Sequence, residues 1–485
     1  MNYRMVVFVL GRIFLVEAAM MLLPMACSAI YGEWYMLPAF LLPAVILLLL
    51  GLAASLRTPK NTTIYARDGL AIVALVWVLM SAFAALPFVI SGEIPAFADA
   101  FFEMVSGFTT TGSTILNDVE ALSHGALFWR SFSHWVGGMG VLVFAMAVLP
   151  MTDGRAMHLM RAEVPGPTCG KLSSKLSDSA KILYGIYFAM TALEVVFLCA
   201  GGMSLYESLI HSFGTAGTGG FSNRGLSIGV YQNPYFEWVI GIFMLLFGVN
   251  FNLYYFILMR HFREAFGSEE LRAYLGIVLF STVTIAANIL SMVGSVGEAV
   301  RTAFFQVSSI ITTTGYATAD FNLWPTYSRI LLLLLMFMGG CAGSTAGGLK
   351  MSRIIIFFKA ARQDLNKMLH THAVTTIRFE GKPLDEKTLQ GVHNYFNVYM
   401  LLIMLSTVLV SLDGFDLTTT FTAVITCINN VGPGMEMVGP MGNFSQFSDP
   451  VKYLLSFDML AGRLELYPML ALFAPRLWRR RRTMR

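Results

Sequence analysis

The stretch at residues 303–321, AFFQVSSIITTTGYATADF, decides how the rest of the chain is interpreted. Its apolar half ends in the polar sequence TTTGY at 312–316. A helix that crosses a bilayer needs ~20 apolar residues, so this half predicts a helix that reaches only partway through the membrane. The polar half predicts non-helical backbone at membrane depth, which is tolerated only where it lines a cavity or is covered by protein.

The composition is typical of a polytopic membrane protein. Hydrophobic residues make up 56% of the 485 residues and charged residues 13%, whereas soluble domains carry roughly 25% charge. The five cysteines are scattered and have neither disulfide nor metal-ligand spacing. No nucleophile–base pair, metal cluster or phosphate loop is recognisable, so the sequence does not indicate an enzyme.

Long apolar runs predict ten membrane crossings. The runs lie at 5–27, 36–56, 69–91, 125–150, 181–202, 233–259, 273–293, 327–349, 391–412 and 451–474. Because this number is even, both termini are expected on one side of the membrane. Most of the 33 basic residues fall at the termini and in the connections on that side, which is therefore predicted to be cytoplasmic.

The opposite connections are acidic, which predicts a mouth that concentrates cations. The acidic residues there are Glu93, Asp99, Asp118, Glu120, Glu207, Glu298, Asp320, Asp413 and Glu436. Polar residues in or near the crossings are expected to form interhelical hydrogen bonds or to lie at helix interfaces. These are His134, His211, Asn250, Asn252 and Glu194.

After the first two crossings, a unit of crossing, half-crossing, Gly-rich strand and crossing occurs four times. The four strands align without gaps as SGFTTTG (106–112), GTAGTGG (214–220), SIITTTG (309–315) and TCINNVG (426–432). The predicted organisation is two N-terminal transmembrane helices (1–67), then repeats at 68–165, 166–265, 266–370 and 371–485. The fold class is an all-α polytopic membrane protein with approximate four-fold symmetry around one ion pathway.

The repeated spacing predicts a cation pore. The C-terminus of each half-crossing carries roughly half a negative charge, and four such ends would favour a cation between them. Carbonyl oxygens of the extended strands can replace the hydration shell of an ion. Glycine suits such backbone because it accepts positive φ and close approach. The alternative, that small residues serve helix packing, is preferred for Gly137, Gly138 and Gly140.

Two further features lie nearer the cytoplasm. The five glycines of MGGCAGSTAGGLK (338–350) predict a break in the eighth crossing, since each costs ~1 kcal/mol against alanine in a helix. Close helix packing is the alternative. Arg463 lies near the midplane of the last crossing, where a charge is a functional hypothesis by default. It is expected to contact the loop or to oppose cation passage; the alternative is an ion pair with Asp458, Glu465 or another helix.

The four pore-loop repeats on one chain resemble the Trk/Ktr/HKT superfamily of potassium transporters. The extra N-terminal crossings and the motifs RAEVPGP (161–167), GGCAGSTAGG (339–348) and GRLELYP (462–468) are similar to its TrkH branch. The resemblance implies a K⁺-translocating subunit of a bacterial inner membrane, usually a homodimer. It also implies a cytosolic, TrkA-like regulatory partner of the RCK type that binds the nucleotide. No covalently bound cofactor and no nucleic acid is expected.

The resemblance assigns a K⁺ site to the filter residues. These are Thr110, Thr111, Gly112, Thr218, Gly219, Gly220, Thr313, Thr314, Gly315, Asn430, Val431 and Gly432. Glycine rather than serine at 112 implies K⁺ over Na⁺, although NNVGPG in the fourth strand implies weaker selectivity than in a symmetric channel. The implied intramembrane gating loop comprises Gly339, Gly340, Gly343, Ser344, Thr345, Gly347, Gly348 and Lys350, and Arg463 is the gate charge.

The function expected from these features is K⁺ uptake through a gated filter. The alternative is an ion-coupled (H⁺ or Na⁺) potassium symporter with a midplane site built from broken helices. Such folds usually have two inverted repeats, whereas these four repeats run in the same orientation.

Overall fold

The computed structural model describes residues 1–61, 64–140, 176–370 and 376–478. The RAEVPGP motif, the predicted boundary between the first two repeats and the last arginines lie outside the described residues. The described chain is helical apart from one short hairpin, β1 (Arg378–Phe379) and β2 (Lys382–Pro383), in which Arg378 pairs with Pro383. The all-α prediction is therefore confirmed.

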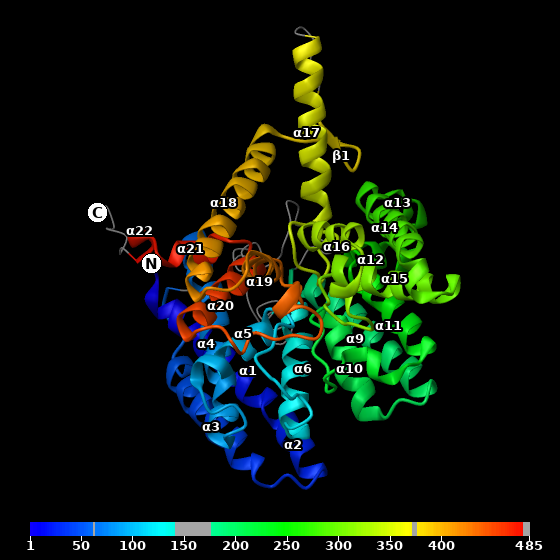
Figure 1. Ribbon diagram of the computed structural model, residues 1–485. Coiled ribbons are helices and arrows are strands. Elements are labelled where there is room, and N and C mark those ends of the chain that lie inside the picture. The colour runs from blue at the N-terminus through cyan, green and yellow to red at the C-terminus, as the bar shows by residue number, and fades with distance from the viewer. Residues whose placement is uncertain (62–63, 141–175, 371–375, 479–485) are drawn as a thin grey trace, which may run out of the picture.

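The N-terminal helices form an antiparallel pair at one side of the bundle (Figure 1). Helix α1 (Tyr3–Met20) continues into α2 (Leu22–Ile30), and α3 (Met36–Ser55) returns along α1. Glycines allow the close approach, because a Cβ on Gly51 would lie 2.8 Å from the carbonyl oxygen of Gly11. These helices correspond to the crossings predicted at 5–27 and 36–56.

Each repeat begins with one long helix. These helices are α4 (Ala66–Ser91), α9 (Leu176–Ala200), α14 (Glu269–Val293) and α18 (Glu386–Val410). Each has at least 25 residues, and at 1.5 Å per residue this length exceeds the ~30 Å hydrocarbon core. Among the described residues, six helices are long and apolar enough to cross a membrane, or seven if one bent pair is counted.

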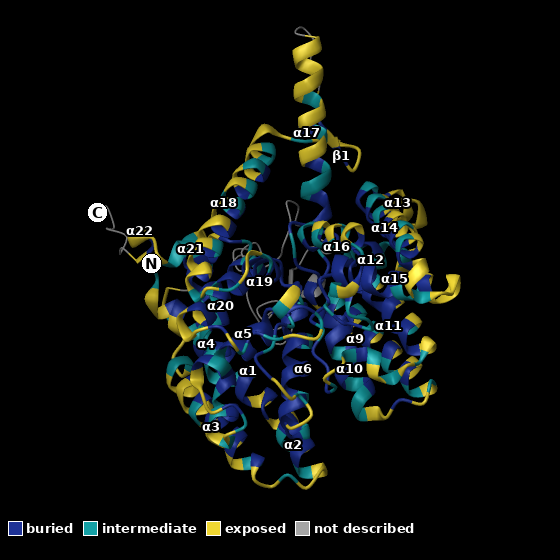
Figure 2. Ribbon diagram, in the orientation of Figure 1, coloured by how far each residue is buried: buried dark blue, intermediate teal, exposed yellow. Residues whose placement is uncertain are grey.

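A shorter helix follows in every repeat, and its C-terminal part is buried (Figure 2). These pore helices are α5 (Phe97–Phe108), α10 (Leu205–Gly217), α15 (Val296–Ile311) and α19 (Leu417–Asn429). Polar residues begin two of them: Ser204 accepts a hydrogen bond from the N–H of Glu207, and Asp416 accepts one from Thr419. The predicted half-crossings are thus short, buried helices.

In the described part of the chain, the helix that begins the last crossing of each repeat ends or bends after 13–15 residues. In repeat one, helix α6 (His124–Gly138) ends at the glycine pair, and in repeat two, α11 (Pro234–Phe247) meets α12 (Phe251–Leu258) at 92°. In repeat three, α16 (Thr326–Met338) ends at the Gly-rich loop, which leads into α17 (Met351–Leu369). In repeat four, α20 (Asp449–Arg463) ends before α21 (Tyr467–Leu472) begins. The predicted break in the eighth crossing is confirmed.

The crossings predicted at 233–259 and 451–474 are each interrupted, which the apolar runs did not indicate. Asn250 begins α12 afresh, because its side chain accepts a hydrogen bond from the N–H of Asn252 at 3.0 Å. At the end of α20, Glu465 and Leu466 have φ of 60° and 64°. Left-handed conformations of this kind cannot continue a right-handed helix.

Short elements connect these helices. They are α13 (Phe262–Gly267), α22 (Pro475–Trp478) and the 3-10 turns η1 (Ser227–Tyr231), η2 (Phe321–Leu323), η3 (Ser411–Asp413) and η4 (Glu436–Val438). Helix α17 projects far out of the bundle, and the two described ends of the chain lie close together (Figure 1). The Tyr3 hydroxyl donates to the backbone carbonyl of Trp478. The two described ends are therefore in contact, which is compatible with the predicted even number of crossings.

The apolar core joins the repeats in a circle. The largest cluster packs α1, α3 and α4 against α5, α6 and α18 to α21. A second cluster packs α14, α15 and α16 against α12 and α19, and a third joins α9, α10, α11 and α12. The pore helices are therefore held from all sides, and the segments that follow them meet in the centre.

Candidate functional site

The four pore helices end in the same way. At each end a left-handed residue is followed by a backbone N–H that bonds back five residues: Thr111 to Ser106, Gly219 to Gly214, Thr314 to Ser309 and Val431 to Thr426, at 2.8–2.9 Å. This is the Schellman pattern of helix termination. The predicted strands that begin here are called filter segments one (110–113), two (218–221), three (313–316) and four (430–433).

The left-handed residue in each segment is not glycine. Thr110, Thr218, Thr313 and Asn430 have φ of 56°, 54°, 56° and 55°. A β-branched residue in this region is a genuine outlier. Such conformations cost about 1–3 kcal/mol, persist only when the surroundings enforce them, and cluster at functional sites. Three strained threonines at equivalent positions therefore mark a functional site.

Two residues later, each segment has a glycine with positive φ, between 76° and 97°. A Cβ on Gly112 would overlap the carbonyl oxygen of Gly219, one on Gly220 that of Thr314, and one on Gly315 that of Val431. A Cβ on Gly432 would lie 2.8 Å from the oxygen of Thr111. The contacts run from segment one to two, two to three, three to four and four back to one, so the segments form a closed ring.

The oxygens available around this ring are uncharged. Asn430 Nδ2 donates to Thr111 Oγ1 at 2.9 Å, which leaves Asn430 Oδ1 and Thr110 Oγ1 buried without a hydrogen-bond partner in the described part of the chain. Within residues 1–61, 64–140, 176–370 and 376–478, no three His, Cys, Asp or Glu side chains are grouped as a metal site. Any cation held here would therefore be bound by carbonyl and hydroxyl oxygens, which suits a weakly hydrated monovalent ion.

A cavity of about 130 Å³ lies on one side of the ring, bordered by the glycines of all four segments. Arg224 lines it and forms ion pairs with Glu207 at 2.8 Å and Glu120 at 3.7 Å. Hydrogen bonds to Glu207 raise the pKa of the Arg224 guanidinium, so it stays charged. Glu436 is likewise paired with Arg329. Several of the acids predicted to attract cations are thus neutralised by neighbours.

The Gly-rich loop (residues 339–350) lies on the other side of the ring and is mostly buried. The N–H of Gly347 donates to Thr313 Oγ1 at 2.7 Å, and the N–H of Gly348 donates to the Asn429 carbonyl at 3.0 Å. Gly347 must be glycine, because a Cβ would overlap that carbonyl oxygen. The loop therefore closes directly on the inner ends of segments three and four.

The start of the loop is attached to the bend in repeat two. Gly339 turns the chain with a φ of 71°. The Cys341 N–H donates to the Gly248 carbonyl at 2.9 Å, and the Phe251 N–H donates to the Gly343 carbonyl at 3.0 Å. These contacts explain why α11 and α12 separate at this level.

Further bonds fold the loop upon itself and anchor it. The Ser344 hydroxyl donates to the Cys341 carbonyl, the Thr345 hydroxyl donates to the Phe247 carbonyl at 3.2 Å, and the N–H of Met351 donates to the Gly340 carbonyl. Glu270 Oε1 accepts from the N–H groups of Ala342 and Ser352 at 2.8 and 2.9 Å.

Lys350 and Arg463 bring two basic side chains to the inner part of the pathway. Lys350 is buried, has a φ of 74°, and donates to the Ala346 carbonyl. Arg463 Nη1 donates to the Thr345 carbonyl at 2.8 Å, and Nη2 donates to the carbonyls of Gly137 and Gly138. The expected contact between Arg463 and the loop is therefore present.

The ion pairs considered as an alternative for Arg463 involve other partners. Glu465 pairs with Arg353, and Asp458 accepts a hydrogen bond from Ser406 at 2.9 Å. The expectation of packing for Gly137 and Gly138 also agrees with the structure, because a Cβ on either would collide with the backbone of Phe108 or Gly217. Their carbonyls additionally hold Arg463, which the sequence did not indicate.

The comparisons with known proteins cover nearly the whole chain. A family model described as "TrkH: Cation transport protein" matches residues 37–480. The "Trk system potassium uptake protein TrkH" of Escherichia coli K12 is 35% identical over 99% of this chain and 100% of its own. The chain belongs to the TrkH family.

Other TrkH-family proteins are similar to the same extent. The "Trk system potassium uptake protein TrkG" of the same organism is 34% identical over 99% of both chains. The crystal structure of the potassium transporter TrkH from Vibrio parahaemolyticus superposes with a TM-score of 0.89, at 31% identity, over 99% of this chain and 100% of that one. This protein is therefore a membrane protein of the Trk potassium uptake family, which comprises transporters and not enzymes.

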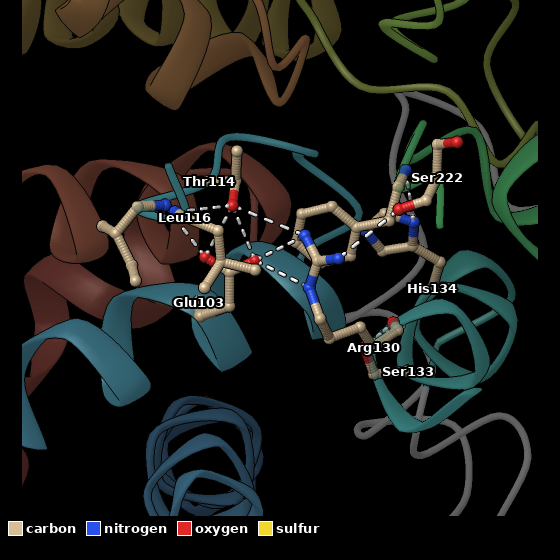
Figure 3. Close-up of polar contacts among 9 residues, drawn as sticks. Glu103, Thr114, Leu116, Arg130, Ser133, His134 and Ser222 are labelled. Carbon is tan, nitrogen blue, oxygen red and sulfur yellow. Dashed lines mark hydrogen bonds and ion pairs between the residues drawn. The ribbon is translucent and has the colours of Figure 1, made fainter. Parts of the chain in front are cut away.

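Sequence reasoning missed two charged residues beside the ring, Glu103 on α5 and Arg130 on α6. Both are buried and form an ion pair at 2.6 Å (Figure 3). The sequence did carry a signal for this pair, because it places a glutamate inside a half-crossing and an arginine inside a crossing. Buried charges are usually paired, so each of these residues indicated a partner of opposite charge.

Proposed function

We propose that this protein conducts K⁺ into the cell along the axis enclosed by filter segments one to four. Each segment supplies backbone carbonyls, and the hydroxyl and amide oxygens of Thr110, Thr313 and Asn430 border the inner end. K⁺ exchanges its water for these oxygens as it enters. A membrane potential of −100 mV drives the ion inward with ~2.3 kcal/mol per charge.

The observation that carries this proposal is the closed ring of glycine–carbonyl contacts. A helix-packing role for the glycines would need contacts between neighbouring helices, but not contacts that return from segment four to segment one. The strain at the three left-handed threonines supports the same interpretation, because ion pathways need backbone oxygens at defined positions.

We propose that the Gly-rich loop and Arg463 form the gate. The loop contacts segments three and four, and Arg463 holds the loop to repeat one through the carbonyls of Thr345, Gly137 and Gly138. In this arrangement a cation leaving the ring meets the loop and the guanidinium charge. Opening requires that the loop and Arg463 separate.

The wider assembly is also part of the proposal. The basic termini and connections face the cytoplasm of a bacterium across its inner membrane, following the positive-inside rule. There they meet a nucleotide-binding, TrkA-like partner, and the membrane subunit forms a homodimer. The repeats divide the chain at 68–165, 166–265, 266–370 and 371–485. The ion-coupled symporter alternative is not favoured.

Flux measurements in liposomes test the filter assignment. The purified chain and its Gly315→Ser variant are reconstituted, and K⁺, Rb⁺ and Na⁺ fluxes are measured without any H⁺ or Na⁺ gradient. We expect K⁺ flux in the wild type and a lost preference for K⁺ in the variant, because a side chain at φ +85° displaces the Val431 carbonyl. Gly276→Ser, where a Cβ has open space, is the control. Equal cation permeation in wild type and Gly315→Ser would contradict the assignment.

A further inference from the structure

We infer that the buried Glu103–Arg130 pair positions the outer ends of filter segments one and two, and thereby sets the discrimination between K⁺ and Na⁺. This inference rests on the proposed function. Glu103 is fully buried against Thr114 and Ile115, and Arg130 borders the outer cavity but its side chain has no oxygen that could bind a cation. Both are therefore positioning residues that act through the segments they hold.

Glu103 holds the outer end of segment one. Its Oε2 accepts from the backbone N–H of Ile115 at 3.0 Å, and both of its oxygens lie within 3.1 Å of Thr114 Oγ1. Because Thr114 and Ile115 immediately follow segment one, the carboxylate fixes where the chain leaves the ring.

Arg130 extends this attachment to segment two (Figure 3). Its Nε and Nη2 both donate to Glu103 Oε1, at 2.8 and 2.6 Å. Its Nη1 points to the Ser222 carbonyl at 3.5 Å, and its guanidinium carbon lies 4.0 Å from the centre of the Phe221 ring. The planar guanidinium can therefore bond the carboxylate and stack on the aromatic ring at once.

Phe221 connects the Glu103–Arg130 pair to segment three. The ring of His134 stacks on Phe221 at 4.2 Å. The Phe221 carbonyl accepts from the Tyr316 hydroxyl at 3.2 Å, and Tyr316 is the last residue of segment three. The pair thus begins a continuous set of contacts across the outer ends of three segments.

The pair also makes repeat one different from the others. Nine residues before the ring glycine stand Glu103, His211, Gln306 and Ala423 in repeats one to four. His211 bonds the Tyr231 hydroxyl at 3.0 Å, and Gln306 approaches Thr318 Oγ1 at 3.4 Å. Of these four positions, repeat one alone carries a carboxylate in an ion pair, and its partner Arg130 reaches the Ser222 carbonyl of the next repeat. Charge-assisted hydrogen bonds are shorter and roughly twice as strong as neutral ones, so this corner of the ring is held most firmly.

The test replaces the planar guanidinium of Arg130 but keeps its positive charge. Arg130→Lys retains a cation for Glu103 but removes the contacts to Ser222 and Phe221. We expect the K⁺/Na⁺ permeability ratio in liposomes to fall about tenfold, which corresponds to about 1.4 kcal/mol of discrimination, while total cation flux persists. The matched control is Arg301→Lys, because Arg301 pairs with Glu237 at 2.9 Å between α15 and α11, away from the ring. Its permeability ratio should stay at the wild-type value.

A well-inserted Arg130→Lys protein with the wild-type permeability ratio would overturn the inference. If this variant does not accumulate, Thr114→Val takes its place, because it removes the hydroxyl between the pair and segment one; a wild-type ratio there overturns the inference equally. Gly315→Ser, measured in parallel, separates the two proposals. A selectivity change in Gly315→Ser but not in Arg130→Lys rejects only the positioning role, whereas no change in Gly315→Ser rejects the filter itself.

Discussion

The outer and inner halves of the four repeats contrast sharply. At the ring, every repeat has the same helix termination, a non-glycine residue in the left-handed conformation at the same position, and the same glycine contact with its neighbour. Below the ring, among the described residues, helix α6 ends at Gly138 in repeat one, the last crossing bends by 92° in repeat two and opens into a loop in repeat three, and α20 ends at Arg463 in repeat four. Selection of an ion needs equivalent ligands, while closure of a path needs one part that differs.

The two halves also depend on different forces. The ring is built from backbone conformation, so its tolerance is set by whether a residue can adopt positive φ beside a carbonyl. The inner half is held by hydrogen bonds between side chains and loop backbone: Arg463 donates to the Thr345 carbonyl, and Thr313 Oγ1 accepts from the Gly347 N–H. Substitutions in the outer half should therefore abolish transport, whereas substitutions in the inner half should increase it.

The largest effect is expected for glycine substitutions in the ring. Gly220→Ala forces alanine to φ +76° and into the Thr314 carbonyl, so K⁺ flux should be almost completely lost and the Tm should fall. Gly432→Ala should retain more flux, because its Cβ would lie 2.8 Å from the nearest oxygen. Liposome flux and thermal unfolding in detergent measure both. Gly276→Ala, in α14 with open space around it, is the control and should gain about 1 kcal/mol of stability. Wild-type flux in Gly220→Ala would show that the ring is not the conduction path.

A smaller effect, of opposite sign, is expected for Arg463→Ala. Hydrogen bonds to charged groups are worth about 1.5–3 kcal/mol each, so K⁺ flux without any regulatory partner should rise about tenfold or more. Deletion of 343–348 should act in the same direction. Arg329→Ala removes an ion pair between repeat three and Glu436 of repeat four, on the outer-cavity side of the ring and not at the loop, and should change flux less than twofold. Unchanged flux in well-inserted Arg463→Ala would remove the gate role from this residue.

The smallest effect should distinguish two equivalent threonines. Thr313→Val removes the acceptor for the Gly347 N–H, a neutral hydrogen bond worth about 0.5–1.5 kcal/mol, so flux should rise roughly threefold to tenfold. Thr110→Val alters the same left-handed position in repeat one, where the hydroxyl has no partner among the described residues, and should not raise flux. The paired K⁺ flux measurement uses both variants in one preparation. An equal rise in both would mean that strain, and not the loop contact, controls opening.

Much of this site could be predicted from the sequence, because its elements rest on local patterns. A short apolar run followed by hydroxyl residues and glycine predicts a half-crossing and a strained strand wherever it occurs. The glycines of the loop likewise predict a break. The way in which the bend of repeat two fits the loop of repeat three could not be predicted from local patterns. At this bend the Gly248 carbonyl accepts a hydrogen bond from the N–H of Cys341, which lies 93 residues further along the chain.

The Glu103–Arg130 pair was missed for a related reason. Glu103 belongs to an apolar half-crossing and Arg130 to a predicted crossing, and 27 residues separate them. Each residue alone is compatible with an interfacial position. Only the fold brings them within 2.6 Å and shows that both are buried.

The closed ring has a consequence for biosynthesis. The contact that completes it, from Ser113 Oγ to the Gly432 carbonyl at 3.1 Å, joins residues 319 positions apart. At about 5–20 residues per second, a ribosome makes that length in roughly 15–65 s. During that time segment four does not yet exist, so segment one lacks its contacts with that segment, including those near Thr110. The Glu103–Arg130 bond lies wholly within repeat one, so it is available long before the last repeat is synthesised.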